Sequence, residues 1–382
     1  MTPRERFLET ILFGKPDRIP LMPGGGREST RARWHKEGLP ENLENLNEIN
    51  AYAYKLAGGA LPFCNDYGGI VPVDHTLKPH FEKKVIEKKE RTQIVQDWKG
   101  NICEISNEYT VDYLGGENAR GDFVTRRWIK CPVENRNDWE KIKTRYNPDD
   151  PARFPENPEQ VNKKLIASDG ASVLHFSGPF WQLREWVGFE NLCMMFYDDP
   201  KLVQDMLDFW KDFVSQLLEK ALRLFKPDIV HLAEDMAYKN FSMISPRMVR
   251  KYILPSYQQW GEILRAAHVP VYEVDSDGFL GELIPIWIEA GINHCSPIEV
   301  AAGNDINEFQ KQFGKKMAYS GSIDKRAMAA GGKVIEDEMK RNGPAIEAGG
   351  FIPTCDHGIP PDISWPDYVY FMKLLAAATG WL

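Results

Sequence analysis

The sequence predicts an α/β protein built as a (β/α)8 TIM barrel, with an N-terminal helical and β-meander extension. From about residue 165 onward, short apolar runs alternate with helical patterns, and six of these runs read ASVLHFSG, DIVHLAEDM, VPVYEVDSDG, GINHCSPIE, KMAYSGSID and GGFIPTCDHG. Strands that alternate with helices form a parallel sheet covered by helices. The length of 382 residues also suits one barrel with additions.

Residues 1–165 are more polar and less regular, and they hold the rest of the predicted barrel. We expect its first two strands near residues 18–22 and 51–70. The extension contains a first helix at residues 3–12 and a charged, alternating stretch at residues 81–127 that predicts a β-meander. A doubly wound open sheet is the alternative, but it calls for a glycine-rich loop after the first strand. MPGGGRES matches GxGxxG poorly, which favours the barrel.

Two long helices have clear start signals. Asp199 is suited to cap a helix that starts at Pro200, and apolar residues then recur with helical spacing through residue 225. Ser245 and Pro246 open a second helix in the same way, and Pro255 predicts a kink within it. The first of these helices therefore has a single apolar stripe.

Composition and charge argue against several classes of function. The net charge of −8 and the pI near 5.6 argue against nucleic acid or an anionic membrane as a partner, because both need a basic surface. No run approaches the roughly 18 apolar residues of a membrane span, and the charged start MTPRERFLETILFGKPDR does not resemble a signal peptide. The six cysteines form no CxxC pair, as is typical of reduced thiols. We therefore expect a cytoplasmic protein.

Polar side chains follow five of the six predicted strands. Barrel enzymes hold their catalytic groups at the C-terminal strand ends, and the polar residues at these ends are Glu234 and Asp235; Asp275 and Asp277; Cys295, Ser296 and Glu299; Ser320 and Ser322; and Cys355, Asp356 and His357. A cap of the following helix also explains any one of these groups, since Asp and Ser are common there. It is the convergence of five groups that predicts a site.

One of these strands carries a row of acids. In VYEVDSDGFLGELIP, the carboxylates of Glu273, Asp275 and Asp277 occupy every second position. Side chains alternate between the two faces of a strand, so we expect these carboxylates on one face, opposite Tyr272 and Val274. Asp277 then stands at the rim of the barrel.

Several phrases together resemble the uroporphyrinogen decarboxylase superfamily. They are RERFLETILFGKPDRIPL, GPFWQLREWVGFENL, LAEDMAYKNFSMISPRMVRKYILPSY, VDSDGFLGELIP, GSIDKRAMAAGG and GGFIPTCDHGIPPDISWPDY. The resemblance extends over nearly the whole chain. It implies one barrel domain over residues 1–382, with the extension and insertions in residues 1–165. It also implies one of two activities, namely decarboxylation of uroporphyrinogen or metal-assisted methyl transfer to or from a corrinoid protein.

The corrinoid-dependent methyltransferase branch is the better match. Uroporphyrinogen decarboxylases carry a phrase of the type PxWxMRQAGR, whose arginines bind the substrate carboxylates, whereas this chain reads PLMPGGGRESTRARWHKEGLPE. Arg27 and Arg31 keep the spacing, but a solvated helix face also explains them. A substrate with eight carboxylates calls for a basic cleft, and the polar strand ends here are mostly acidic. A uroporphyrinogen-type or small-acid decarboxylase and a non-catalytic ligand-binding barrel remain as alternatives.

The resemblance implies a zinc site with altered ligands. In related methyltransferases the strand matching VDSDG carries a His-x-Cys pair of zinc ligands, and a later cysteine completes the site. Here Asp275 and Asp277 replace the pair, and Cys355 matches the later cysteine. A catalytic zinc needs three protein ligands and accepts carboxylate oxygen, so the implied set is Asp277, Cys295 and Cys355. His357 is a competing ligand. The alternatives are buried cysteines that act as small apolar residues and a metal-free acid/base pair of Asp277 and His357.

The resemblance to the methyltransferase branch implies an enzyme that moves a methyl group from a small O- or N-methylated substrate, such as a methoxyaromatic compound, to a corrinoid carried on a separate protein. Zinc or a protonated side chain activates the heteroatom. The predicted catalytic residues are Asp277, His357, Glu234 and Asp235. The predicted substrate-binding residues are Phe180 and Trp181 as an aromatic wall, with core packing as the alternative, together with Arg184 and Glu299. A small-acid decarboxylase would use Arg184, Lys239 or Lys325.

Overall fold

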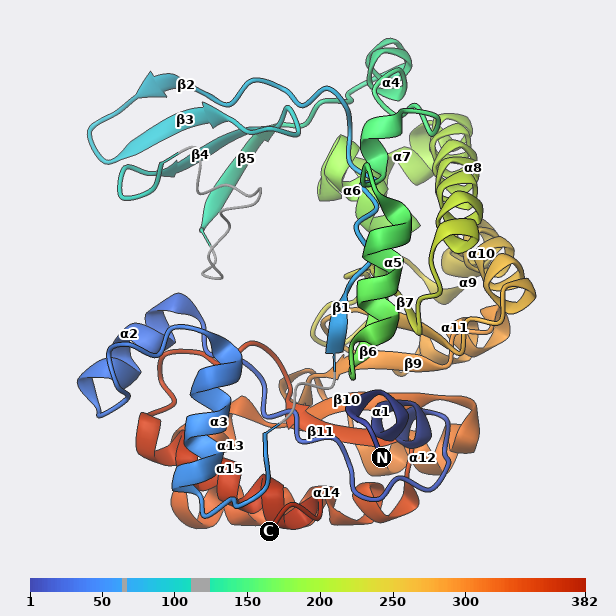
Figure 1. Cartoon of the computed structure of the whole chain (residues 1–382). Helices are drawn as coiled ribbons and strands as arrows, with labels where there is room; N and C mark the ends of the chain where they lie inside the picture. Colours follow the sequence, from blue (N-terminus) through green and yellow to red (C-terminus); the bar gives the residue numbers. More distant parts are fainter. Residues whose placement is uncertain (64–66, 111–123) are drawn as a thin grey trace.

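The computed structural model describes residues 1–63, 67–110 and 124–382, which contain two separate sheets (Figure 1). The larger sheet is parallel and curled, and its strands are hydrogen-bonded in the order β1-β6-β7-β8-β9-β10-β11. They are β1 (Tyr67–Ile70), β6 (Ala171–Ser177), β7 (Ile229–Ala233), β8 (Val271–Asp275), β9 (His294–Ile298), β10 (Ala318–Ile323) and β11 (Phe351–Cys355). Strands that follow one another within this sheet are also neighbours in space, as in a TIM-like barrel. The predicted α/β barrel fold is confirmed.

Helices cover the outer face of this sheet (Figure 1). They are α6 (Pro179–Val187), α7 (Phe189–Asp198), α8 (Pro200–Leu224), α9 (Pro246–Met248), α10 (Leu254–Ala266), α11 (Ile284–Ala290), α12 (Ile306–Phe313), α13 (Lys325–Ala330), α14 (Gly332–Ala348) and α15 (Trp365–Ala378). The predicted cap of α8 is present, since the Asp199 side chain accepts a hydrogen bond from the Leu202 amide at 3.0 Å. The predicted interruption near Pro255 is a π-helical turn just before α10. No helix in the described part of the chain is both long and apolar enough to cross a bilayer.

The N-terminal part adds three helices and the second sheet. The helices are α1 (Pro3–Ile11), α2 (Glu28–Lys36) and α3 (Leu46–Leu56). The second sheet is antiparallel, with strands β2 (Lys84–Lys88), β3 (Thr92–Gln96), β4 (Ile102–Ser106) and β5 (Arg126–Lys130) in sequence order. This is the predicted β-meander, and Figure 1 shows it projecting from the parallel sheet. Helices α4 (Arg136–Lys143) and α5 (Pro158–Ala167) then lead back to β6.

The two strands expected in the N-terminal part differ from the prediction. Residues 18–22 are extended chain without strand pairing; Pro20 and Pro23 explain this, because proline lacks the amide that a central strand must donate. Among residues 51–63 and 67–70, which the structure describes, only Tyr67–Ile70 form a strand, and α3 covers residues 46–56; residues 64–66 of the predicted range lie outside the described residues. Ile49, Ala53 and Tyr54 of α3 recur at helical spacing and are buried, which favours the helix.

The extended N-terminal segment nevertheless lies beside β11, where a further barrel strand would be. Gly26 forms an isolated parallel bridge with Ile359. The Arg27 amide donates to the Ile359 carbonyl at 3.2 Å, and the Ile359 amide donates to the Gly25 carbonyl at 3.0 Å. These bonds bring Arg27 to the C-terminal end of β11.

The strands of the curled sheet have an apolar outer face and a largely polar inner face. Outer residues pack against the helices in the main core, among them Leu174, Phe176, Leu232, Val274, Cys295 and Tyr319. The N-terminal end of the inner face is apolar and consists of Ala171, Ile229, Val271, Ala318 and Ile352. Phe7 and Ile11 of α1 pack against these residues and form the floor of the barrel. Polar inner residues begin directly above this floor.

Replacing Phe7 with alanine tests whether α1 closes the floor. Phe7 is fully buried among the inner residues of the strands, so Phe7→Ala should lower the free energy of unfolding by about 3–5 kcal/mol, as removal of a buried aromatic ring usually does. Leu12→Ala removes a side chain that is 46% exposed and serves as the control, with an expected change within about 0.5 kcal/mol. Urea denaturation measures both. An equally small effect of the two substitutions would contradict this role of α1.

Candidate active site

The inner face of the sheet remains accessible to solvent above the apolar floor. Its side chains are partly exposed, including those of His175, Ser177, His231, Asp275, Ser296 and Thr354. The outer-face residues that alternate with them, such as Leu174, Leu232 and Val274, are buried. Solvent therefore reaches the polar groups on the inner face, whereas the outer face is closed by packing.

His357 and Asp277 form the centre of the candidate site. His357 follows β11, and its Nε2 lies 3.3 Å from Oδ2 of Asp277, which follows β8. The Gly358 amide nitrogen and Nη2 of Arg27 lie 2.7 and 3.1 Å from Nδ1 of His357. Both groups can only donate, so Nδ1 accepts and the ring hydrogen is assigned to Nε2, directed at Asp277. The pair is the acid/base arrangement that the sequence offered as an alternative to zinc.

Two influences act on His357 in opposite directions. The hydrogen bond and the charge of Asp277 raise the pKa of His357, because the carboxylate favours the imidazolium form. A second ring proton would have to bind at Nδ1, where Arg27 now donates. Uptake of that proton therefore requires both the Arg27 side chain and the Gly358 amide to move away from Nδ1. Asp277 raises the pKa of His357, whereas Arg27 lies against the nitrogen at which the second proton would bind.

A second carboxylate, Asp235, lies beside Asp277. Its Oδ1 accepts a hydrogen bond from the Asp277 amide at 3.1 Å. Arg184 Nη1 donates to the main-chain carbonyl of Asp235 at 3.0 Å, and its guanidinium lies over the Trp181 ring at 4.2 Å from the centroid. Burial and the neighbouring Asp277 raise the pKa of Asp235. The predicted residues Asp235, Asp277, Arg184 and Trp181 therefore come together.

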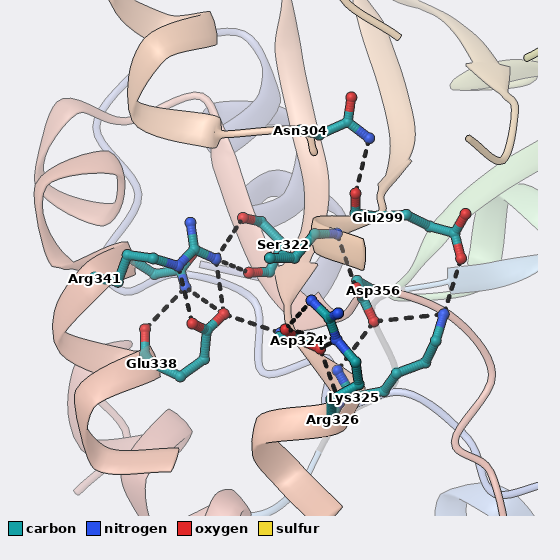
Figure 2. Close-up of polar contacts among 11 residues, drawn as sticks. Glu299, Asn304, Ser322, Asp324, Lys325, Arg326, Glu338, Arg341 and Asp356 are labelled. Atoms are coloured by element: carbon teal, nitrogen blue, oxygen red, sulfur yellow. Dashed lines mark hydrogen bonds and ion pairs between the residues drawn. The ribbon is translucent and has the colours of Figure 1, made fainter. Parts of the chain in front are cut away.

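Lys325 joins two further carboxylates at the same end of the sheet (Figure 2). Its Nζ lies 2.8 Å from Oε1 of Glu299 and 3.9 Å from Oδ1 of Asp356, and Figure 2 shows the side chain extending between them. Oε2 of Glu299 accepts from the Gly278 amide at 3.0 Å. Gly278 has a φ of +87°, and a Cβ there would collide with the main chain of Ala237. Only glycine suits this junction between the β8 loop and Glu299.

A neighbouring network in Figure 2 fixes the start of α13. Arg341 of α14 donates to the Ser322 carbonyl and to Oε1 of Glu338, both at 2.7 Å. The same Glu338 oxygen accepts from the Asp324 amide at 2.9 Å, and Asp324 in turn caps α13 by accepting from the Arg326 amide at 2.8 Å. This network holds the first residue of α13, Lys325, beside its two carboxylates.

A row of polar side chains crosses the inner face below these groups. Nδ1 of His231 lies 3.0 Å from Oε2 of Glu273, and Nδ1 of His294 lies 3.2 Å from Oε1. Ser296 donates to Oε1 of Glu273 at 3.2 Å, and Nε2 of His294 lies 2.8 Å from the hydroxyl oxygen of Ser320. Burial acts to raise the pKa of Glu273, but the two histidines outweigh it and lower the pKa to about 2. Glu273 is therefore a buried carboxylate.

The three residues implied as zinc ligands do not come together, so the predicted zinc set does not fit the structure. Cys295 is fully buried on the outer face of β9 in the main core, and Cys355 lies in a second core with residues of α2, α3 and α15. Strand alternation turns both thiols away from Asp277, and burial raises the pKa of both thiols. Within residues 1–63, 67–110 and 124–382, no three His, Cys, Asp or Glu side chains are placed to hold a metal ion.

Two other predicted residues lie in the packing behind the site. Glu234 is fully buried, and its Oε1 accepts from the Phe180 amide at 2.7 Å. Burial raises the pKa of Glu234 well above its ordinary value. Phe180 is itself fully buried in the main core. The roles of orienting carboxylate and aromatic wall therefore suit Asp235 and Trp181 better, and Lys239 is exposed in the loop after β7.

The inner row of histidines is not predicted from the sequence. His175 and His231 each lie within a run that reads as an apolar strand. A usable signal is nevertheless present, because the alternation within each strand places four polar side chains on the same face of the sheet: His175, His231, Glu273 and His294. The structure pairs these residues in neighbouring strands. The contact of Arg27 with His357 has no sequence signal, since 330 residues separate them.

Replacing Asp277 with asparagine tests the proton pair. Loss of the carboxylate charge removes the main cause of the raised pKa of His357, so that pKa should fall in Asp277→Asn. NMR titration of the imidazole signals measures it, with His357 assigned through its absence in His357→Asn. Asp362→Asn removes an exposed carboxylate from the same loop and should leave the pKa of His357 unchanged. An unchanged value in Asp277→Asn would contradict the pair.

Comparisons with known proteins define the family of this chain. The fold is similar to a solved methyltransferase from Methanosarcina mazei, with a TM-score of 0.55 and 15% identity over 100% of this chain and 98% of that chain. A B12-independent methionine synthase from Shewanella sp. W3-18-1 in complex with selenomethionine gives a TM-score of 0.43 and 10% identity over 95% of this chain and 97% of that chain. No curated protein sequence matches. Residues 129–377 match the family model described as uroporphyrinogen decarboxylase (URO-D). Because this match spans more than half of the sequence, the chain belongs to the uroporphyrinogen decarboxylase (URO-D) family.

Proposed function

We propose that this protein is a methyltransferase that takes a methyl group from a small O- or N-methylated substrate and passes it to a corrinoid on a separate protein. The contact between His357 and Asp277 carries the proposal, because it places an acid/base pair where barrel enzymes hold their catalytic groups. Similarity to a protein described as a methyltransferase supports the same class. Acid/base activation takes the place of zinc, since the thiols lie in the two cores.

Methyl transfer from an ether or amine is assisted by a proton on the heteroatom that leaves. The C–O or C–N bond breaks, its electron pair remains on the heteroatom, and the methyl group moves to the nucleophile that a reduced corrinoid supplies when bound. We assign the proton to the imidazolium of His357, which Asp277 favours. The proton leaves His357 for the heteroatom, and the ring returns to the neutral form seen beside Arg27.

Arg27 and Trp181 provide the proposed contacts that couple substrate binding to this proton transfer. An acceptor group on the substrate that draws the guanidinium of Arg27 from Nδ1 leaves the Gly358 amide as the remaining donor there, and a shift of the loop at Gly358 then lets this nitrogen take up a proton. Trp181 presents its ring beside Arg184 and Asp235 and so offers a flat surface to an aromatic substrate. Substrate binding thereby promotes the acidic form of His357.

Replacing His357 with asparagine tests the proposed reaction. His357→Asn removes the proton donor and should lower kcat for methyl transfer from methoxyarenes or methylamines to a reduced corrinoid by about 10²–10⁴-fold, the usual contribution of an acid/base group. His268→Asn is the matched control because His268 is exposed and has a φ of +57°, which asparagine tolerates. Spectroscopy of the corrinoid measures the transfer. Equal rates in the two variants would contradict the role of His357.

A small-acid decarboxylase is the second candidate, and the cations at the site favour it. Arg27, Arg184 and Lys325 all lie at the C-terminal strand ends, where they contact His357, Asp235 and Glu299. A substrate carboxylate would have to displace these partners. Carbon dioxide release from uroporphyrinogen or small acids, measured on the same preparations, distinguishes this candidate from methyl transfer. Release that depends on His357 in the absence of methyl transfer would favour the decarboxylase.

A further inference from the structure

The pair of His231 and Glu273 has no part in the proposed reaction. Glu273 is 5% exposed, and its two oxygens are occupied by His231, His294 and Ser296. At this low exposure the carboxylate itself is largely closed to a ligand. Its contact with Nδ1 of His231 instead fixes the orientation of that ring and directs Nε2 to the opposite side.

Nε2 of His231 is the group of this pair that a ligand can reach. Within the described residues, no hydrogen bond reaches this nitrogen, and the His231 side chain is 21% exposed although it lies on the inner face of the sheet. The His175 ring stacks on the His231 ring at a centroid distance of 5.0 Å and covers one face. An imidazole held by a carboxylate on one nitrogen and open on the other is an oriented donor or base.

The surrounding groups decide which form of His231 a ligand meets. Burial acts to lower the pKa of His231, but the Glu273 carboxylate outweighs it and raises the pKa. Burial lowers the pKa of His175 to about 3 and also lowers that of His294, so burial disfavours the charged form of both rings. Asp275 faces the same interior from β8, and burial raises its pKa to about 7. Among these inner histidines, His231 is therefore the one whose surroundings favour the form with a proton on both nitrogens.

We propose that Nε2 of His231 binds the carboxylate of a small organic acid inside the barrel, with Glu273 as the positioning residue. A charged N–H donor forms its strongest hydrogen bonds with anionic oxygen. Repulsion from Glu273 is reduced, because its carboxylate accepts from Nδ1 of His231 and from the Ser296 hydroxyl and lies 3.2 Å from Nδ1 of His294. The proposal concerns binding alone and stands whether methyl transfer or decarboxylation is the reaction.

Binding of acetate and benzoate to the purified protein tests the site without any reaction. Isothermal titration calorimetry should show binding to the wild type, and affinity at least about tenfold weaker in His231→Asn, the factor that a hydrogen bond to a charged group contributes. Glu273→Gln keeps the shape of the side chain but loses the charge that favours imidazolium, so it should also weaken binding. His268→Asn is the control and should bind as the wild type does. Affinity should fall as the pH rises through the raised pKa of His231.

A measurement on the wild type keeps the proposal testable if the variants fold poorly. Bound acetate should raise the pKa of one buried histidine in an NMR titration, and that signal should be shifted in Glu273→Gln. Absence of binding by both acids, or equal affinity in the wild type and His231→Asn, would overturn the proposal. Preferential binding of benzylammonium that depends on His231 would also overturn it, because a cation cannot accept from Nε2–H. None of these results depends on corrinoid or on carbon dioxide release.

Discussion

The inner face of the barrel is organised around the buried carboxylate of Glu273. Such a charge without partners is strongly unfavourable inside a protein. Histidines from β7 and β9 and the Ser296 hydroxyl supply the compensating contacts, so side chains as well as main-chain bonds link three neighbouring strands. A slip of β8 by one residue would turn Tyr272 or Val274 inward and leave these donors without an acceptor. The register of the sheet and the polar interior therefore depend on each other.

The sequence predicts the architecture well because hydrophobic periodicity reflects the burial of each face. It correctly gives the strands from residue 171 onward, the β-meander and the cap of α8 at Asp199. It fails for contacts between residues that are far apart in the sequence. It also fails where a shift of one residue in the strand alternation decides whether a side chain points inward or outward. Cys295 and His294 are adjacent, and only the pairing of β9 with its neighbours shows that the imidazole points inward. Arg27 reaches His357 through the folded N-terminal segment, which local patterns do not reveal.

The end of β8 carries carboxylates at the positions where the resemblance implies zinc ligands, and this changes which reactions the site can support. The resemblance implies imidazole and thiolate ligands at this strand in related methyltransferases, and both suit zinc. Here Asp277 has His357 as its partner, and the two thiols have raised pKa values within apolar cores. Both thiols also point into these cores and away from Asp277, so they do not complete a zinc site with it. The same place in the fold is therefore better suited to transferring a proton than to polarising a substrate with a metal.

The two histidine–carboxylate pairs lie in different environments, and this difference assigns them different roles. Asp277 is 41% exposed, so water screens its pairing with His357, which is worth about 0–1 kcal/mol in such a setting. A substrate can therefore replace one partner at low energetic cost. Glu273 is 5% exposed, and loss of a partner there leaves a buried charge uncompensated. In the proposed function the outer pair exchanges its contacts with the substrate, whereas the buried contact with Glu273 holds the His231 ring in one orientation.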